Sequence, residues 1–430
     1  MRIFQSCSRG RGGPSALERS PCPGHRRWPS NRVVSIGFGV WWYLVIATCG
    51  TGTVAAGEPA KPILILAHYM PWYEGKPTTE AWGWHWTMNS FDPEQVAGGR
   101  RSIASKLYPA IGPYDSGDPH VIEYQLLLMK LAGIDGVIID WYGRTDLWDY
   151  ARIHANARRV VEAAMRFGMK VAVCYEDKTI SSLTKEGKIP ADSRVAHAAA
   201  EIKWLAEHWF PLDAYVRIDG RPVLLSFGNE GLTDEEWSQS IEQASVPVAY
   251  FSEHRRRSAA IGGFDWPVPS EGLRAIHRFE TDSKAWPQRI PIAFPRFLDV
   301  YAEAKVHPSW GSVADGEGAT FRMTLERALK TRATLVQIAT WNDWGEGTII
   351  EPSLEYGTRD LEVVQELRRR HVDATFRGDA AVLQLPGRLL QLRRGNPDEE
   401  RRQRLDGVVD LLVAGEGSQA LAMIEALEGK

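Results

Sequence analysis

Cysteine is scarce in this chain of 430 residues. Of the four cysteines, Cys7, Cys22 and Cys49 lie near the N-terminus, and only Cys174 falls in the remaining 381 residues (430 − 49). A single thiol cannot form an internal disulfide, so the folded part must be stabilised by its hydrophobic core. Cys174 stands in the apolar run KVAVCYE, and we expect it to be a small apolar filler.

An excess of charge is also lacking, because 51 Lys and Arg residues nearly balance 54 Asp and Glu residues, for a net charge of −3. This balance gives no electrostatic reason to expect binding of nucleic acid. The 11 histidines never occur at HxxxH or HExxH spacing, so we expect no metal and no other cofactor. No glycine-rich phosphate turn follows the first apolar run of the folded part, which disfavours a nucleotide-binding fold.

The first 56 residues form a leader. Residues 1–32 are rich in Arg, Pro, Ser and Gly, residues 33–49 form an uncharged apolar run, and Ala55 and Ala56 follow among small residues. Basic, apolar and small-residue segments in this order are typical of an export signal. Because the run is near the lower length limit of a membrane span, an uncleaved anchor is the alternative. We predict a periplasmic or extracellular protein, either secreted or anchored through residues 33–49.

Beyond the leader, apolar runs of strand length alternate with amphipathic helical segments. Continuous apolar runs are typical of parallel strands that are buried on both faces. The eight expected strands are 62–69, 136–142, 170–176, 221–228, 247–253, 261–266, 290–295 and 334–341. This pattern predicts a (β/α)8 TIM barrel over residues 57–365, and a doubly wound open sheet is its rival.

Two regions fall outside the alternation. Residues 70–118 form a long connection after the first strand, and they carry the aromatic cluster WGWHW at 82–86. A loop of that length is usually functional. Residues 366–430 are rich in Arg and Leu, and we predict that they form a small C-terminal helical extension.

Polar and aromatic residues follow almost every apolar run. In a TIM barrel the active site is built at the carboxyl ends of the strands. Indole rings pack against the apolar faces of sugars, while acids, amides and histidines bind the hydroxyl groups. We therefore predict sugar binding by a set of strand-end residues and two residues of the long loop: His68, Tyr69, Trp72, Trp86, Asp140, Trp141, Tyr175, Glu176, Trp266, Asn342 and Trp344.

The last strand runs into ATWNDWGEGTIIEPS at 339–353, where Asp343 and Glu346 stand close together. Hydrolysis of a glycosidic bond needs two carboxyl groups, one to donate a proton and one to act as base or nucleophile. Gly345 and Gly347 would let the loop bend so that both carboxyl groups face one cavity. The plain alternative is that Asp343 and Glu346 are solvated loop acids.

Other candidates also have structural alternatives. His68 could be a hydrogen-bonded core histidine, and Asp140 could accept hydrogen bonds from loop amides. Glu176 could form an ion pair with Lys178. The WGWHW cluster could be a hydrophobic plug rather than the wall of a sugar subsite.

Several motifs resemble known glycosidases. TWNDWGEGTIIEP (340–352) resembles the terminal-strand motif of glycoside hydrolase family 99, the endo-α-mannosidases, where Asn-Glu-Trp-x-Glu-Gly-Thr is typical. It is also similar to the Thr-Trp-Asn-Asp-Tyr-Gly-Glu motif of family 71, the α-1,3-glucanases. AHYMPWY (67–73) and LAGIDGVIIDWYG (131–143) resemble both families, and YPAIGPYDSGDP (108–119) is closer to family 99. The resemblance extends over residues 62–360.

The resemblance implies a family 71/99-like glycosidase that acts on an α-mannan or α-glucan type of polysaccharide or glycan. By position, Glu346 would be the general acid. Asp343 stands where family 99 usually has Glu, the base proposed to act on the sugar's 2-hydroxyl with retention of configuration. Family 71 has Asp there and is associated with inversion, in which the base activates water. A non-catalytic carbohydrate-binding protein on the same barrel is the rival function.

Overall fold

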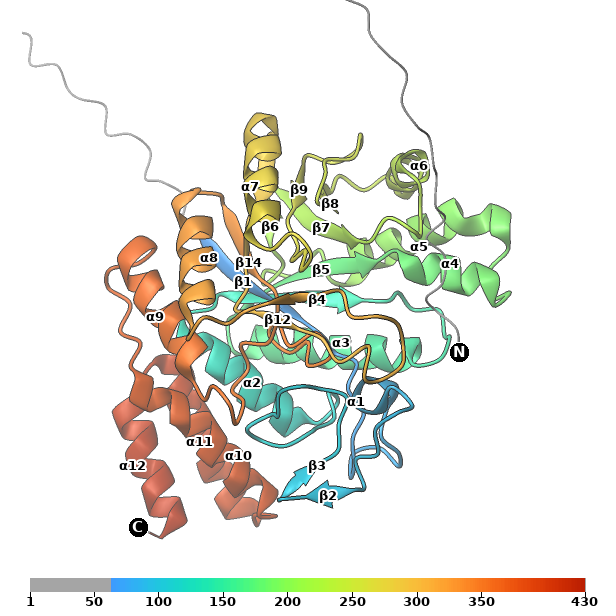
Figure 1. Cartoon of the computed structure of the whole chain (residues 1–430). Helices are drawn as coiled ribbons and strands as arrows, with labels where there is room; N and C mark the ends of the chain where they lie inside the picture. The colour runs from blue at the N-terminus through green and yellow to red at the C-terminus, as the bar shows by residue number, and fades with distance from the viewer. Residues whose placement is uncertain (1–62, 430) are drawn as a thin grey trace, which may run out of the picture. The chain divides into compact units, whose positions relative to one another are not determined.

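Eight parallel strands form the centre of the computed structural model, which describes residues 63–429 (Figure 1). The strands are β1 (Leu64–Tyr69), β4 (Gly136–Trp141), β5 (Lys170–Glu176), β7 (Arg221–Phe227), β8 (Ala249–Glu253), β9 (Gly262–Phe264), β10 (Gln288–Ile290) with β11 (Ile292–Ala293), and β14 (Leu335–Ile338). The eight predicted runs are confirmed as strands. A short strand, β6 (Arg217–Ile218), pairs antiparallel with β7.

The sheet closes on itself through one interrupted strand. Its order is β10-β9-β8-β7-β5-β4-β1-β14-β11, and only Pro291 separates β10 from β11. The proline has no N–H to donate, so the ladder changes partner there: β10 pairs with β9, and β11 pairs with β14. The predicted TIM barrel is confirmed, and an open sheet is excluded.

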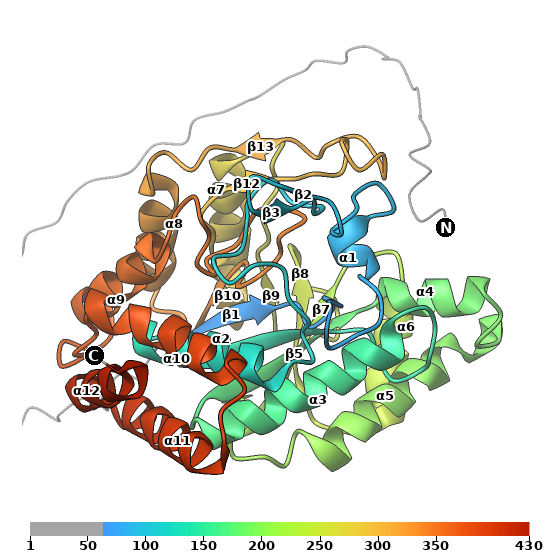
Figure 2. The ribbon, with the colours of Figure 1, turned by 90° about the horizontal axis from the view of Figure 1, so that it is seen from below.

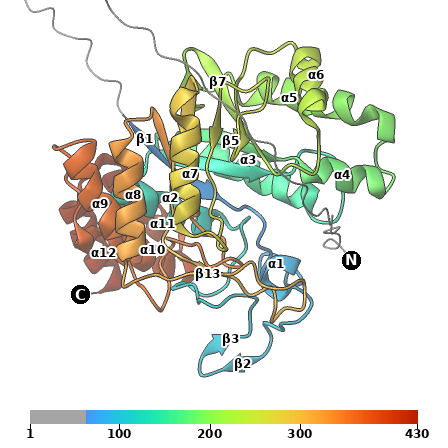
Figure 3. The same ribbon diagram turned by 45° about the horizontal axis from the view of Figure 1, so that its top comes forward.

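Helices cover the outside of this barrel (Figures 1 and 3). They are α2 (Pro119–Ala132), α3 (Tyr150–Arg166), α4 (Lys178–Lys185), η1 (Ala191–Ser193), α5 (Arg194–His208), α6 (Asp234–Ala244), α7 (Leu273–Asp282), η2 (Ser283–Ala285), α8 (Ala319–Lys330) and α9 (Arg359–His371). Local sequence sets several of their starts. The Asp118 side chain caps α2, and Thr233 with Glu236 forms a capping box on α6.

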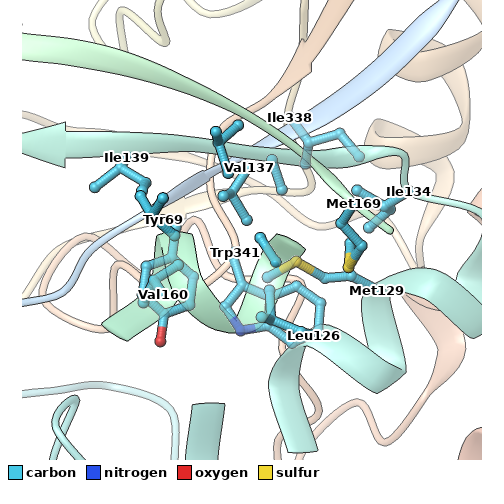
Figure 4. Packing of buried hydrophobic residues seen from close by; sticks show 14 of the residues in the cluster. Tyr69, Leu126, Met129, Ile134, Val137, Ile139, Val160, Met169, Ile338 and Trp341 are labelled. Atoms are coloured by element: carbon cyan, nitrogen blue, oxygen red, sulfur yellow. The ribbon is translucent and has the colours of Figure 1, made fainter. Parts of the chain in front are cut away.

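Alternate side chains of each strand divide the core into two layers. Tyr69, Val137 and Ile338 point outward and pack against α2 side chains such as Leu126 and Met129 (Figure 4). Side chains one position along each strand fill the barrel interior instead, among them Leu66, Ile138, Cys174, Leu225 and Phe251. Cys174 is therefore the apolar filler that its sequence context predicted. Burial of each large apolar side chain stabilises the fold by about 1.5–3 kcal/mol.

Two long segments contact each other beside the barrel (Figure 2). The first, residues 70–118, contains α1 (Trp84–Thr87), β2 (Val96–Ala97) and β3 (Arg100–Arg101). The second follows β11 and contains β12 (Phe297–Leu298) and β13 (Ser312–Val313). Met88 and Ala104 of the first segment pack with Val300 and Ala304 of the second. The two segments thus form one structural unit next to the loop after β14.

The C-terminal residues form η3 (Ala380–Gln384), α10 (Leu385–Arg394), α11 (Glu399–Ala414) and α12 (Gly417–Glu428), which lie beside α2 and α9 (Figure 1). The guanidinium of Arg393 on α10 binds both carboxylate oxygens of Glu123 on α2, at 3.0 and 3.1 Å. The predicted domain boundary at residue 366 falls inside α9. None of the helices between residues 63 and 429 is long and apolar enough to cross a membrane. The predicted leader lies outside the described residues.

Candidate active site

Four barrel strands carry a polar side chain at the last position that faces the interior. These residues are His68 of β1, Asp140 of β4, Glu176 of β5 and Glu253 of β8. Each stands two positions after an apolar residue of the interior, so strand alternation points it toward the barrel axis. Three of the four were predicted as site residues. Glu253 was not, although it also ends a predicted strand.

The loop after β14 brings two more carboxyl groups to this end of the barrel. The Asp343 backbone N–H donates to Thr340 Oγ1 at 2.8 Å, and Asp343 Oδ1 accepts from the Glu346 N–H at 3.0 Å. These local bonds make residues 340–346 a tight turn with a set orientation for both carboxyl groups. Asp343 is buried and Glu346 is half-buried. Neither is a solvated loop acid.

Glycine is required in this loop because another chain segment passes close to it. The Leu298 N–H donates to Glu346 O at 2.8 Å, and the Val300 N–H donates to Gly345 O at 3.0 Å. Gly347 has φ +65°, and a Cβ there would lie 2.8 Å from Leu298 O. A larger residue at 347 would therefore strain the backbone and displace the segment that carries Leu298.

The buried carboxyl groups influence one another's ionisation. Burial raises the pKa of Asp343 to about 6. Burial, and then the charge of Asp343, raises the pKa of Asp140 to about 8 and the pKa of Glu346 well above its usual range. The pKa of Glu176 is raised by burial and by Asp140. Asp343 therefore ionises before its neighbours, while Glu346 keeps its proton.

His68 and Trp266 form a neutral wall of the same site. The ring edge of His68 meets Trp266 with centroids 4.7 Å apart, and His68 Nε2 lies 2.8 Å from Gln337 Oε1. Burial lowers the pKa of His68 to about 4, so the ring is neutral at ordinary pH. Trp72 is half-buried on the adjoining loop and stacks on His85 at 4.4 Å.

Three of the predicted sugar-binding side chains point away from the barrel interior, because side chains alternate along each strand. Tyr69, Trp141 and Tyr175 are each the chain neighbour of an interior residue, so they point outward into the layer below the helices. The Tyr69 hydroxyl donates to Gln125 Oε1 at 2.5 Å, and Trp141 Nε1 donates to His154 Nδ1 at 3.1 Å. The prediction of sugar binding for these three residues is corrected: they are core residues.

Three further residues predicted to bind sugar are buried and form hydrogen bonds to the loops around the site. Trp86 and Trp344 are fully buried. Trp86 Nε1 donates to Tyr114 O at 2.7 Å, and Trp344 Nε1 donates to Glu351 Oε2 at 3.2 Å. The Asn342 amide is bound to both backbone groups of Met70, at 2.8 and 3.0 Å. All three hold loops together, and this placement corrects the prediction that they bind sugar.

A buried carboxyl group, Glu351, lies at the centre of that support. It accepts hydrogen bonds from the Tyr114 hydroxyl at 2.7 Å, Gln125 Nε2 at 2.8 Å and Trp344 Nε1. Burial raises its pKa to about 7. Glu351 was not predicted as a site residue. It follows Ile349 and Ile350 in the sequence, and nothing in this pattern distinguishes it from an acid on the surface.

The segment after β11 supplies groups that the sequence analysis also missed. The Tyr301 hydroxyl lies 3.5 Å from Glu346 Oε1, and the negative charge of Asp299 adds to the raised pKa of Glu346. From Tyr301 the rings continue outward through His307 to Trp310, with centroids 4.4 and 4.5 Å apart. Trp310 is 49% exposed. This segment directly follows the seventh predicted strand. Because TIM-barrel active sites are built at the carboxyl ends of the strands, the sequence could have indicated these residues.

Acidic residues are numerous at this end of the barrel. Among residues 63–429, no group of three or more His, Cys, Asp and Glu side chains is placed to hold a metal ion. The carboxyl groups at this end of the barrel differ in pKa and lie near aromatic rings.

Two known proteins and one solved structure are similar to this chain. The chain matches no protein-family model. It is 25% identical over 316 residues to the glycoprotein endo-alpha-1,2-mannosidase-like protein of Danio rerio, covering 66% of this chain and 69% of that protein. It is 23% identical over 328 residues to the glycoprotein endo-alpha-1,2-mannosidase of Mus musculus, covering 69% of each chain.

A solved structure has the same fold. The GH99 endo-alpha-mannosidase from Bacteroides thetaiotaomicron matches with a TM-score of 0.54 at 16% identity, covering 71% of this chain and 97% of that chain. The resemblance to family 99 is thus confirmed.

Replacement of Trp86 by Ala tests its role as a buried support. The substitution removes a fully buried ring and its hydrogen bond to Tyr114 O, so the free energy of unfolding should fall by about 3–5 kcal/mol. Urea denaturation measures the loss, and Trp148→Ala is the control because Trp148 is 43% exposed. Unchanged stability combined with weaker glycan binding would show instead that Trp86 contacts sugar.

Proposed function

We propose that this protein is an exported glycoside hydrolase that cleaves α-linked mannose glycans and that Asp343 and Glu346 are its catalytic carboxyl groups. The observation that carries the proposal is the pair of carboxyl groups at the carboxyl end of the barrel, Asp343 buried and Glu346 half-buried, with pKa values pushed apart. The similarity to endo-α-mannosidases supports mannose as the sugar. The leader supports export, through either a cleaved signal or an anchor at residues 33–49.

The difference in pKa assigns the two roles. Glu346 retains its proton and donates it to the glycosidic oxygen as the leaving group departs. Asp343 is ionised and accepts a proton, from the sugar's 2-hydroxyl group or from an attacking water. Asp343 has one methylene fewer than the Glu usual in family 99, and its hydrogen bond from the Glu346 N–H orients it.

The other polar groups at this end of the barrel surround the reacting sugar. His68, Asp140 and Glu176 face the axis and can bind its hydroxyl groups, while Trp266 and Trp72 offer apolar faces. The ring series that begins at Tyr301 extends away from Glu346, the residue that protonates the leaving group. We assign Trp310 to the leaving-group side of the cleaved bond.

Paired substitutions test the catalytic roles. Glu346→Gln keeps size and hydrogen bonding but removes the transferable proton, so turnover of an α-mannan should fall by about 10²- to 10⁴-fold. A glycosyl fluoride needs little protonation to leave, so its hydrolysis should be largely spared. Asp343→Asn should impair both substrates, because the base is needed whatever group leaves. Initial rates on the two substrates measure the difference.

The same experiment separates the alternatives. Equal losses on both substrates in both variants would show that the roles are wrongly assigned. Binding of mannan without turnover by the unmodified protein would show a carbohydrate-binding protein rather than an enzyme. Unchanged unfolding midpoints in the two variants are the control for correct folding.

The pH dependence of kcat/KM should show an acidic limb near pH 6. The pKa of Asp343 is raised to about 6, so below that pH the base becomes protonated and kcat/KM should fall about tenfold per pH unit. Glu346 must stay protonated, so its raised pKa sets the alkaline limb. On glycosyl fluoride, Glu346→Gln should lose the alkaline limb and keep the acidic one. An acidic limb near pH 4 would show that Asp343 is not the titrating base.

Trp310→Ala tests the leaving-group side. Loss of the exposed ring should lower kcat/KM on a long mannan by about 5- to 30-fold, as expected for one sugar–aromatic contact. Hydrolysis of a glycosyl fluoride should be unchanged, because it has no sugar on that side. Trp310→Phe should restore most of the activity. A loss of equal size on both substrates would place Trp310 elsewhere in the site.

A further inference from the structure

A pocket lies at the opposite end of the barrel from the carboxyl cluster. Its volume is about 340 Å³. Gln288 and Arg289 open β10, and Thr334 directly precedes β14, so the pocket is at the amino ends of these strands. The remaining lining comes from the two turns that lead into these strands: Ser283, Lys284, Trp286 and Pro287, and Thr331, Arg332 and Ala333.

The charged groups of this pocket all have one sign. Lys284, Arg289 and Arg332 line it, and no acidic side chain is among its ten lining residues. The side chains of Lys284 and Arg289 make no hydrogen bond or ion pair to any residue between 63 and 429. Arg332 makes one long bond, from Nη1 to His371 O at 3.4 Å. Three cations held together without a counter-charge repel one another.

The pocket lies beside the carboxyl ends of α7 and α8, which favour nearby cations. Lys284 and Arg332 are exposed, whereas Ser283 is 1% exposed and its Oγ is closed off from the pocket.

We propose that this basal pocket binds a phosphate-type oxyanion. A tetrahedral oxyanion would neutralise the three cations and accept paired N–H bonds from the Arg289 guanidinium. The pocket is large enough to hold such an ion with water. The site is independent of the proposed glycosidase activity, since the strands separate it from Asp343 and Glu346.

Two sources of this chemistry fit the location. The Leu64 N–H donates to Thr334 O at 2.9 Å, so the chain enters β1 beside the pocket. The oxyanion could be a free phosphate ion or the phosphate of an anionic lipid headgroup at the membrane that the protein crosses or is attached to. Both sources present the same group to Lys284, Arg289 and Arg332.

Calorimetric titration with inorganic phosphate tests the site directly. The unmodified protein should bind phosphate, and Lys284→Gln with Arg289→Gln should weaken binding by about tenfold or more, because two charge-assisted contacts are lost. Lys203→Gln with Arg404→Gln is the matched control, since both residues are exposed and lie on other helices. The control should bind as the unmodified protein does.

Vesicle sedimentation distinguishes the sources. Retention on phosphatidylglycerol vesicles but not on phosphatidylcholine vesicles, reduced in the Lys284 and Arg289 variant and kept in the control, would identify a lipid headgroup. Phosphate binding without vesicle retention would identify a free ion. If neither phosphate binding nor vesicle retention depends on Lys284 and Arg289, the proposal is wrong. Unchanged mannan hydrolysis in the variant would confirm that its fold is intact.

Discussion

The alternation of side chains across the wall of a closed barrel is the constraint on which the rest of this structure depends. Each strand residue faces either the axis or the helices, and its neighbour faces the opposite way. In the pairs His68 with Tyr69 and Asp140 with Trp141, one residue therefore reaches the site and the other joins the core. Neighbouring residues of one strand therefore supply both a polar group at the candidate site and an aromatic ring that packs against the helices.

Burial of like charges sets the order in which the carboxyl groups of this cluster ionise. Several acids that meet at the end of one barrel cannot all ionise, so their pKa values separate. Asp343 receives the hydrogen bond of the Glu346 N–H and ionises first. Burial, and then the charge of Asp343, raises the pKa of Glu346 and of Asp140, so both stay protonated. The proposed acid and base, only three positions apart, differ in pKa because their surroundings differ.

The cluster is held by hydrogen bonds beneath it that do not take part in the proposed chemistry. The Asn342 amide clamps the backbone after β1, and Glu351 joins the loop after β14 to the long segment through Tyr114 and to α2 through Gln125. The close approach of Leu298 to Gly347 adds the segment after β11. Three segments that are distant in sequence are thereby fixed relative to the two carboxyl groups.

The sequence by itself determined the barrel, because its eight apolar runs are continuous and each became a strand. It also placed Asp343 and Glu346 at the carboxyl end of the last strand, where local motif and fold rule agree. Only the tertiary structure decided that Trp86, Trp344 and Asn342 are supports, and that Tyr301 stands beside Glu346 with His307 and Trp310 farther out. Whether an aromatic ring binds sugar or fills a core depends on contacts with distant segments, and a side chain's identity carries no record of those contacts.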